Sequence, residues 1–366
     1  MATASDAGQD GRVHRLLGHV ADRIPPVARL RADRDRLSGE VDDLRDQLAR
    51  AEADCLAALR TGQQQAERAE QAEAQVAALD RQVADLRPSE PAYRLYPEGH
   101  FYSPLPDLPD VRERAAQLFD RTGGVAGMDV RLNEQLGLLD ELAPALARWP
   151  HGDPAEGRGW RFRPDNAFFG WTDSQLWYAL LATRRPRRVV EVGSGWSTAL
   201  LLDACDREDL DTRVTAIEPF PARLHSVMRP GDEHRVTVQP MKVQDVPAAE
   251  LADLQAGDVL FVDSTHVSKI GSDVNHLVFG VFPRLPAGVL VHVHDIAYPF
   301  EYPQEWVEEG RAWNEAYLLR AFLLENQRWR VSLWSSLLWL REPDRMRGAL
   351  HPGTLIDGGS LWLETT

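Results

Sequence analysis

The chain has 366 residues, of which 43% are hydrophobic, so it is long enough to bury a full core beside an appendage. Its net charge of −15 makes nucleic acid a poor first candidate for a partner, because such binding rests on Lys and Arg neutralising phosphates. Cys55 and Cys205 lie far apart, which argues against a disulfide framework and favours a cytoplasmic location. The sequence has neither a run of about eighteen apolar residues nor the apolar core of a signal peptide, so no membrane span is predicted.

Residues 27–87 repeat apolar side chains at alternating spacings of three and four. One track contains Leu30, Leu37, Leu44, Leu79 and Leu86, and the other contains Val27, Val41, Leu48, Val76 and Val83. A single apolar stripe along a helix needs a partner helix to bury it. The segment therefore predicts a self-associating coiled coil that follows a flexible N-terminus over residues 1–26. A long solvated helix is the alternative interpretation.

Six prolines between residues 88 and 109 end this helix, because proline lacks the N–H that a helix interior requires. Residues 88–170 are predicted to form a linker and a helical extension that packs on a sheet or caps its edge. Residues 171–185 then form a helix that leads into the first strand, with Thr172 or Asp173 as its expected N-cap.

Residues 171–366 are predicted to form one α/β domain. After residue 186, short β-branched strands alternate with helical stretches, a pattern typical of a Rossmann-like open sheet that is mainly parallel and covered on both faces. The last two strands, residues 328–334 and 360–366, have no predicted helix between them. They are expected to form a terminal antiparallel hairpin at the edge of the sheet.

The first strand ends in the turn Glu191-Val-Gly-Ser-Gly-Trp-Ser-Thr198. Gly193 and Gly195 lack a Cβ atom, so their backbone can approach a ligand, and the helix that comes next offers free N–H groups. A dinucleotide fingerprint of the GxGxxG type would need a third glycine at residue 198, which is threonine. The turn therefore predicts a nucleotide-like ligand and disfavours nicotinamide and flavin cofactors.

The next two strands also end in polar residues. Glu218 follows the second strand, where a carboxylate can accept both hydroxyls of a ribose. Gln244 and Asp245 follow the third strand and suit the amino edge of adenine. Solvated strand-end carboxylates are the alternative interpretation of any single acid, although the ordered set favours a ligand site.

This order of features resembles the class I S-adenosylmethionine-dependent methyltransferases: a Glu-x-Gly-x-Gly turn, an acid after strand two, Gln-Asp after strand three and Asp after strand four. The resemblance implies S-adenosylmethionine as the cofactor. The predicted cofactor site consists of residues at the first three strand ends: Glu191, Gly193, Ser194, Gly195, Ser197, Glu218, Gln244 and Asp245.

Asp263 ends the fourth strand and Asp295 ends the fifth, so two carboxylates should face one crevice. Together they could hold a divalent cation that lowers the pKa of an acceptor hydroxyl. His266, three residues after Asp263, could then accept the hydroxyl proton, because a free imidazole titrates near neutrality. This part of the chain is similar to metal-dependent sugar O-methyltransferases of macrolide pathways, which implies Asp263 and Asp295 as metal ligands and His266 as the base.

His294 departs from that pattern, in which a carboxylate precedes the second acid. The predicted metal site is therefore Asp263, His294 and Asp295, with Mg or Mn as the ion, although an imidazole ligand suits Zn, Fe or Mn better than Mg. A metal-free reaction with His266 or His294 as base stays open.

The loop after the fifth strand carries Tyr298, Glu301, Tyr302 and Trp306, which could contact an acceptor or pack against the domain. Residues 99–366 resemble bacterial methyltransferases of glycan and secondary-metabolite gene clusters. The predicted function is O-methylation of a sugar, glycan or secondary metabolite. The alternatives are a coiled-coil scaffold that recruits a partner through an inactive methyltransferase-like domain, and another α/β enzyme that uses a nucleotide cofactor.

Overall fold

The computed structural model describes residues 29–50 except 42, 46 and 49, and residues 96–150, 159–354 and 358–366. Contacts divide the chain into two compact units, residues 1–95 and 96–366. The described residues of the first unit are helical, as predicted, and the rest of the expected coiled coil lies outside the described residues. Among the helices that the structure describes, none combines the length and the apolar character needed to cross a membrane.

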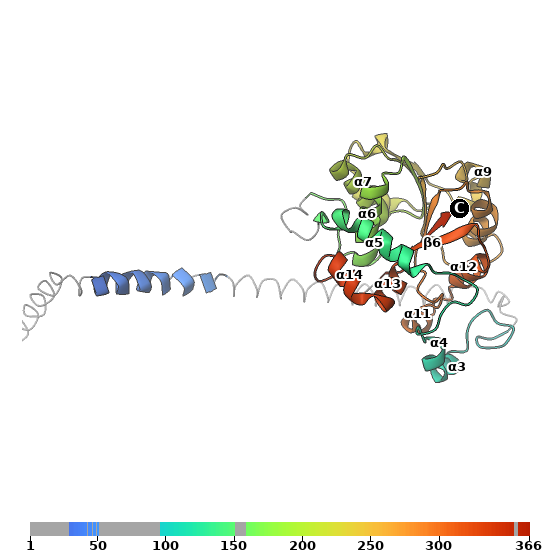
Figure 1. The fold of residues 1–366 in the computed structure, drawn as a ribbon, viewed down its shortest axis with the longest axis horizontal. Helices are drawn as coiled ribbons and strands as arrows, with labels where there is room; N and C mark the ends of the chain where they lie inside the picture. The colour runs from blue at the N-terminus through green and yellow to red at the C-terminus, as the bar shows by residue number, and fades with distance from the viewer. Residues whose placement is uncertain are drawn as a thin grey trace, which may run out of the picture. The chain divides into compact units, whose positions relative to one another are not determined.

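The second unit is built on one sheet, which has seven strands within the described residues (Figure 1). Their order in the sheet is β3-β2-β1-β4-β5-β7-β6. The strands are β1 (Arg188–Val192), β2 (Arg213–Ile217), β3 (Val236–Gln239), β4 (Val259–Val262), β5 (Leu290–Val293), β6 (Trp329–Trp334) and β7 (Leu361–Thr365). The first five are parallel, whereas β7 runs antiparallel to both β5 and β6. The predicted Rossmann-like, mainly parallel sheet with an antiparallel end is thus confirmed.

The connection between the last two strands differs from the prediction. Two helices, α13 (Ser335–Arg341) and α14 (Pro343–Ala349), separate β6 from β7 along the chain. The two strands still pair, but β7 enters the sheet between β5 and β6. The expected antiparallel pairing of the last two strands is confirmed, whereas the expectation that no helix separates them is wrong. Apolar residues of the two helices, such as Leu338 and Met346, join the core, which explains why this segment is helical and not a loop.

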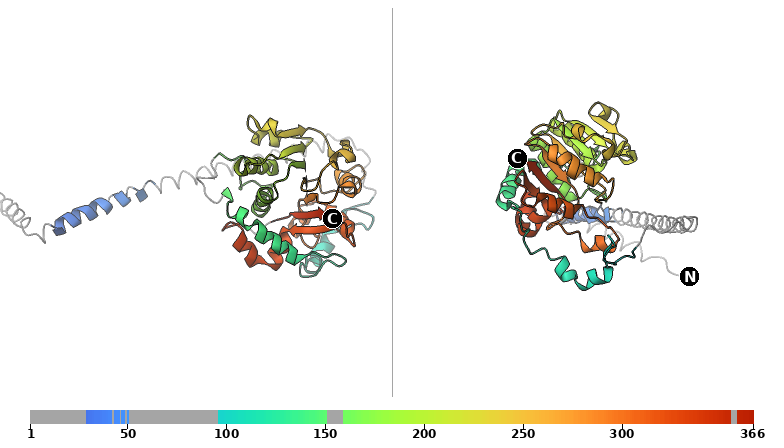
Figure 2. Two further views of the ribbon diagram at one scale, coloured as in Figure 1. Left: turned by 45° about the horizontal axis from the view of Figure 1, so that its top comes forward. Right: turned by 90° about the vertical axis from the view of Figure 1, so that its right-hand side faces the viewer.

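Helices cover both faces of the sheet (Figure 2). One buried cluster joins the sheet to α5 (Leu132–Leu146), α6 (Trp171–Arg184), α7 (Trp196–Glu208), α8 (Ala222–Val227), α13 and α14. The cluster on the other face includes η3 (Val243–Asp245), α9 (Ala248–Leu251), α10 (Asp273–Asn275), η4 (His276–Val281), η5 (Phe282–Arg284) and α12 (Glu315–Leu323). The remaining short helices are α3 (Leu108–Glu113), α4 (Ala115–Leu118), η2 (Asp232–His234) and α11 (Gln304–Glu308).

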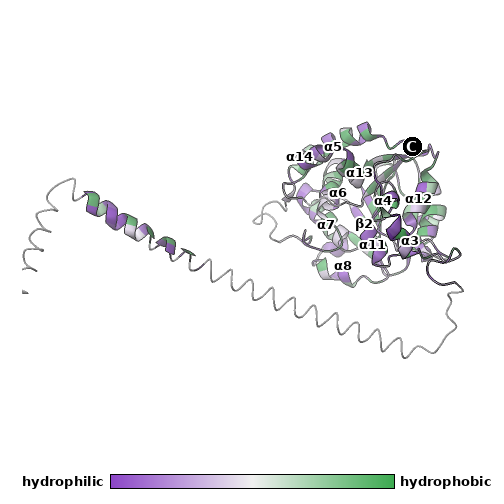
Figure 3. Cartoon of the chain, turned by 90° about the horizontal axis from the view of Figure 1, so that it is seen from below, coloured by the Kyte–Doolittle hydropathy of each residue, from purple (hydrophilic) through white to green (hydrophobic). Residues whose placement is uncertain are grey.

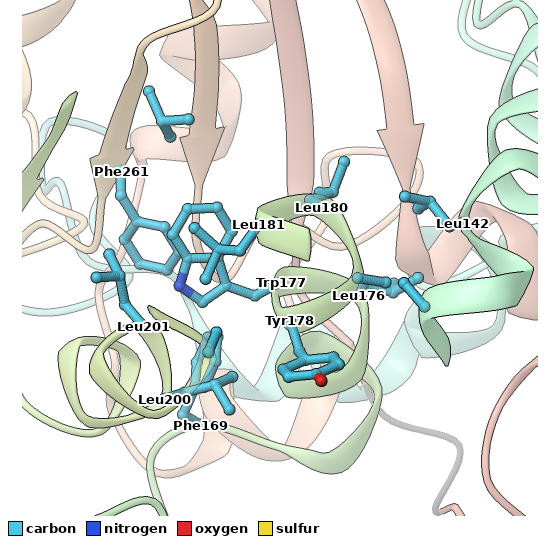
Figure 4. Close-up of a cluster of buried hydrophobic side chains, with 14 of the residues drawn as sticks. Leu142, Phe169, Leu176, Trp177, Tyr178, Leu180, Leu181, Leu200, Leu201 and Phe261 are labelled. Carbon is cyan, nitrogen blue, oxygen red and sulfur yellow. The ribbon is translucent and has the colours of Figure 1, made fainter. Parts of the chain in front are cut away.

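Helix α6 lies against the middle of the sheet. The Trp177 ring packs between Phe261 of β4 and Trp362 of β7, at centroid distances of 5.3 and 5.2 Å (Figure 4). The helix is capped by Gly170, so the expected cap at Thr172 or Asp173 is wrong. Both residues are buried inside the helix because their side chains serve the tertiary fold: Asp173 accepts the backbone N–H groups of Gly359 and Ser360.

The helical extension belongs to the same core. Helix α5 packs on α6 through buried leucines such as Leu139 and Leu142. It also contacts the edge strand β6, because the Gln135 side-chain oxygen accepts the N–H of Trp334 at 2.8 Å. The extension therefore covers the edge of the sheet, and the carboxyl ends of the central strands stay open for a site.

Candidate active site

The turn after β1 is held tightly against the end of β4. Gly193 has φ +80°, and a Cβ atom at this position would lie 2.2 Å from the carbonyl oxygen of Asp263. The Gly193 N–H donates to the carbonyl of Ile217 in β2, which fixes the turn from the other side. Only glycine fits this conformation and this distance. A Cβ at Gly195 would meet the Arg223 side chain at 2.9 Å, so the second glycine has a packing role as well.

Two side chains beside this turn carry buried oxygen atoms without a hydrogen-bond partner among the described residues. Glu191 is fully buried on the face covered by α7, and its Oε2 atom accepts the Thr198 hydroxyl at 2.5 Å, while Oε1 has no partner. Burial raises the pKa of Glu191 to about 7, although bonds from Thr198 and Ser197 oppose that shift. The Ser194 hydroxyl is likewise buried and unpaired. Such groups suit a bound ligand that supplies the missing donors.

The other predicted cofactor residues also lie beyond the carboxyl ends of the strands. The carboxylate of Glu218 accepts the N–H of Ser194 at 3.4 Å and that of Phe220 at 2.8 Å, so it adjoins the glycine turn. Gln244 and Asp245 form part of η3, directly after β3. The Gln244 side chain donates to the carbonyl of Gly271 at 3.0 Å, and Asp245 is exposed. The structure thus brings Glu218 to the turn, while Gln244 is already engaged elsewhere.

His266 lies between the two acids that the sequence singled out. Its Nε2 atom is 3.4 Å from Oδ1 of Asp263 and 3.7 Å from Oδ2 of Asp295. The backbone of His266 has φ +59°, a left-handed conformation that is uncommon outside glycine and often marks functional sites. The ends of β4 and β5 therefore bring these three predicted residues together.

Glu315, at the start of α12, completes this cluster. Its buried carboxylate binds His266 Nδ1 at 2.9 Å and accepts the Ser264 hydroxyl at 2.9 Å. The N–H groups of Asn314 and Glu315 both donate to the carbonyl of His266, so the helix start is tied to the histidine. The Trp313 ring lies against the imidazole at a centroid distance of 4.2 Å. Sequence reasoning missed Glu315, because an acid in the first turn of a helix is common for helix stability alone.

These contacts change the protonation state of His266. Burial alone would lower its pKa, but the hydrogen bonds and charges of Asp263 and Glu315 outweigh burial and raise it to about 10. The imidazole therefore carries a proton at neutral pH in this structure, whereas a free imidazole titrates near neutrality.

His294 points toward the same acids from the end of β5. Its Nε2 atom lies 3.6 Å from Oδ1 of Asp295, and its Nδ1 atom lies 3.3 Å from Nε2 of His292. His292 is stacked on Phe261 at 3.9 Å, and burial lowers its pKa well below the usual value. His292 is therefore neutral, and it holds the orientation of His294 from inside the core.

The arrangement of the described side chains gives the predicted metal site no support. Within the described residues, no group of three or more His, Cys, Asp or Glu side chains is arranged to hold a metal ion. The Nε2 atom of His266 lies near both Asp263 and Asp295, so a cationic imidazole already occupies the position between these acids. We therefore derive no step through a metal ion.

A cavity of about 550 Å³ adjoins this cluster. Asp295 and His294 line it together with the aromatic side chains of Phe168, Trp306 and Trp339. Its wall at Gly358 and Gly359 is fixed to α6, because the N–H of Gly359 donates to the Asp173 carboxylate. The cavity has the size of a small-molecule site, mostly apolar with a few polar groups.

Of the four loop residues proposed to contact an acceptor, only Trp306 lines this cavity. Tyr298 and Tyr302 are buried in the core, and their hydroxyls bind backbone groups, the carbonyl of Gly123 and the N–H of Ala316. Glu301 accepts the Tyr317 hydroxyl at 2.5 Å. Packing of the loop thus explains three of the four residues.

Residues 190–296, which contain these strand ends, match the family model described as "Methyltransferase domain". A curated relative, an uncharacterized protein of Archaeoglobus fulgidus, is 31% identical over 133 residues, which are 35% of this chain. The chain spans 60% of the length of that relative. The match of residues 190–296 to the family model confirms the predicted methyltransferase domain, and this family implies S-adenosylmethionine as methyl donor.

Solved structures of methyltransferases are also similar. The structure titled "cmcI-D160 Mg-SAM" is 18% identical, with a TM-score of 0.34 over 53% of this chain and 71% of that one. The SAH-bound Podospora anserina methyltransferase PaMTH1 is 13% identical, with a TM-score of 0.35 over 72% and 98%. Mitomycin 7-O-methyltransferase MmcR is 16% identical, with a TM-score of 0.32 over 72% and 74%. Likenesses this distant say nothing about the acceptor of this chain.

Replacing Glu315 with Gln should lower the pKa of His266, because the variant keeps the shape of the side chain but removes the charge that favours the imidazolium. NMR titration of the full chain with labelled histidine measures this pKa, which is about 10 in the native protein. Glu301→Gln is the matched control, since Glu301 binds Tyr317 and not His266. An unchanged pKa in Glu315→Gln would show that the pair does not form.

Proposed function

We propose that the chain is an S-adenosylmethionine-dependent O-methyltransferase that acts on a hydroxyl of a sugar, glycan or secondary metabolite. The observation that carries this proposal is the cluster of His266 with Asp263 and Asp295 beside a cavity. The cluster lies at the carboxyl ends of the strands, where the glycine turn also lies. In an open α/β sheet, ligands bind in the crevice outside the carboxyl ends of the strands.

The residues around the glycine turn fit the cofactor. The unpaired Oε1 atom of Glu191 and the unpaired hydroxyl of Ser194 offer hydrogen-bonding groups to it. Gly193, Gly195 and Ser197 form the adjoining turn and helix start, Glu218 would bind the ribose hydroxyls, and Gln244 and Asp245 would border the adenine. When bound, S-adenosylmethionine supplies a methyl group already activated on a positively charged sulfur. Three carboxylates, Asp263, Asp295 and Glu315, surround one imidazolium nearby. The net negative charge of this cluster favours a cationic ligand.

In this proposal the protein's own groups position the acceptor and take its proton. Asp295 lines the cavity and would accept a hydrogen bond from the acceptor hydroxyl. In its neutral form, which is the minor form at neutral pH, His266 would act as the base through Nε2, because Glu315 occupies its other nitrogen. Asp263 and Asp295 would stabilise the protonated imidazole that results. A divalent Mg or Mn ion is not needed in this scheme, and the side chains of the described residues give it no support.

The rival functions predict different ligands. A scaffold with an inactive domain should bind no cofactor, yet the buried unpaired oxygens of Glu191 and Ser194 favour a ligand. An enzyme with a nicotinamide cofactor should bind NAD(H), which the threonine at residue 198 disfavours. We place the activity in the cytoplasm, consistent with Cys205 being a buried free thiol.

We also propose that the N-terminal helix makes the chain an oligomer. Five large apolar residues at the seam positions, Leu30, Leu37, Val41, Leu44 and Leu48, are exposed on the single chain. Figure 3 shows hydrophobic segments between hydrophilic ones along this helix. In a parallel coiled coil with this register, Glu40 of one helix would face Arg45 of the partner subunit. In an antiparallel one, acids would face acids and arginines would face arginines. The charges thus favour the parallel arrangement.

Calorimetry with S-adenosylhomocysteine tests the cofactor site. The native chain should bind it with micromolar or better affinity. Gly193→Ala should abolish this binding, because its Cβ would force the turn away from Asp263. Gly231→Ala is the matched control: it also has positive φ, but no atom lies within 4 Å of its Cβ position. No binding to the native chain, or equal binding by Gly193→Ala, would overturn the cofactor assignment.

The pH dependence of methyl transfer tests the base. With a pKa of about 10, only about one His266 in a thousand is neutral at pH 7, so the rate should rise about tenfold per pH unit until it levels near that value. Transfer from labelled S-adenosylmethionine to a pool of extracted metabolites, followed by mass spectrometry, measures the rate. His266→Ala should keep cofactor binding and lose roughly 10²–10⁴-fold in rate. A rate that does not vary with pH would assign the base role to Asp295.

Light scattering after size exclusion tests the oligomer. Combined replacement of Leu37 and Leu44 by Lys should convert the full chain to a monomer, because charges cannot be buried in the seam. Ala32→Lys is the control, since residue 32 lies opposite the seam in this register and is exposed. The native chain and the control should keep the larger mass. A monomeric native chain would refute the coiled coil.

A further inference from the structure

Arg121 is a half-buried guanidinium that lines the 550 Å³ cavity. Within the described residues it makes no hydrogen bond, ion pair or cation–π contact. Other arginines of the second unit behave differently. The buried Arg161 pairs with Asp203, Asp206 and Asp232, whereas arginines that lack a partner among the described residues, such as Arg213, are exposed to water. A partly desolvated charge without a partner is energetically unfavourable. Arg121 is therefore a candidate for binding an anionic ligand.

The acid that precedes Arg121 in sequence and the acids that share a second cavity with it form no ion pair with its guanidinium. The carboxylate of Asp120 accepts the N–H of Thr122 at 2.8 Å. Glu301 and Glu305 share a smaller cavity of about 360 Å³ with Arg121, but neither forms an ion pair with it. Glu301 instead accepts the Tyr317 hydroxyl. The guanidinium therefore stays available to an anion.

A second guanidinium lies close to the segment that carries Arg121. Arg341 donates to the carbonyls of Thr122 and Gly123, which follow Arg121 directly, and its guanidinium lies over the Tyr298 ring. Arg341 is exposed and does not itself line the cavity, so Arg121 is the guanidinium that a ligand in the cavity would meet. Arg121 is the only arginine or lysine among the described residues that line the cavity, so it is the group there that would attract an anion.

We infer that the methyl acceptor carries an anionic oxygen group, a carboxylate or a phosphate, which binds Arg121 while an acceptor hydroxyl reaches Asp295. This inference rests on the proposed O-methyltransferase function, because it names the acceptor of that same site. The planar guanidinium matches both oxyanions with two parallel hydrogen bonds. Trp306 and Trp339 offer apolar faces to the body of the acceptor. A sugar that bears an acid group, such as a uronic acid or a sugar phosphate, has all of these features.

Three probes that differ only at C6 of the sugar test this inference: 4-nitrophenyl β-D-glucoside, its 6-phosphate and 4-nitrophenyl β-D-glucuronide. Calorimetry is carried out on the full chain with saturating S-adenosylhomocysteine. At least one anionic probe should bind about tenfold more tightly than the neutral glucoside. Which of the two binds better distinguishes a carboxylate from a phosphate. Arg121→Gln should remove this advantage, and Arg213→Gln, an equal change of charge on an exposed residue, should keep it.

Equal binding of the neutral and anionic probes would overturn the inference, and so would an advantage that Arg121→Gln leaves intact. Failure of all three probes to bind, in samples that bind S-adenosylhomocysteine, would overturn the anionic-sugar acceptor and leave the cofactor proposal standing. Loss of S-adenosylhomocysteine binding in the native chain would instead refute the proposed function itself.

Discussion

The contact between the turn after β1 and the end of β4 is the constraint on which the rest of the site depends. The carbonyl oxygen of Asp263 occupies the space that any side chain on residue 193 would need. The turn can therefore approach β4 only as glycine, and this approach brings the buried carboxylate of Glu191, which has an unpaired oxygen, within electrostatic range of Asp263. The glycine, which by itself predicts only a ligand loop, also joins the proposed cofactor half of the site to the His266 cluster.

Burial of charge is the second constraint, and it explains how His266 is held. An imidazolium in the interior is unfavourable unless carboxylates surround it. Glu315 provides one of these acids from α12, a helix on the opposite side of the histidine from the strand ends, and Ser264 fixes that carboxylate in turn. Because one nitrogen of His266 is committed to Glu315, the other is directed to Asp263 and Asp295. The orientation of the ring therefore depends on a residue that has no place in the strand-end pattern.

The sequence was sufficient for the features that repeat along the chain. Alternating strands and helices predicted the sheet, and polar residues at the strand ends predicted the meeting of Asp263, His266 and Asp295, because parallel strands end at one edge. Features that depend on contacts between distant segments were missed. Glu315 is 49 residues from His266, Asp173 is 186 residues from Gly359, and nothing in their local sequence marks these pairs. The helices between β6 and β7 were also missed, because the sequence pattern predicted no helix between the last two strands.

The charged groups of the cavity favour one orientation of a bound acceptor. The carboxylate of Asp295 lies at the end of β5, and the guanidinium of Arg121 comes from the extension that precedes the sheet. A neutral acceptor would gain little from either charge and could enter in several orientations. An acceptor with a hydroxyl and an acid group has one orientation in which both charges are satisfied. Orientation of this kind contributes to catalysis because it fixes the reacting oxygen before the methyl group is transferred. On this proposal the extension, far from the strand ends in sequence, would contribute to acceptor specificity and would not only cover the edge of the sheet.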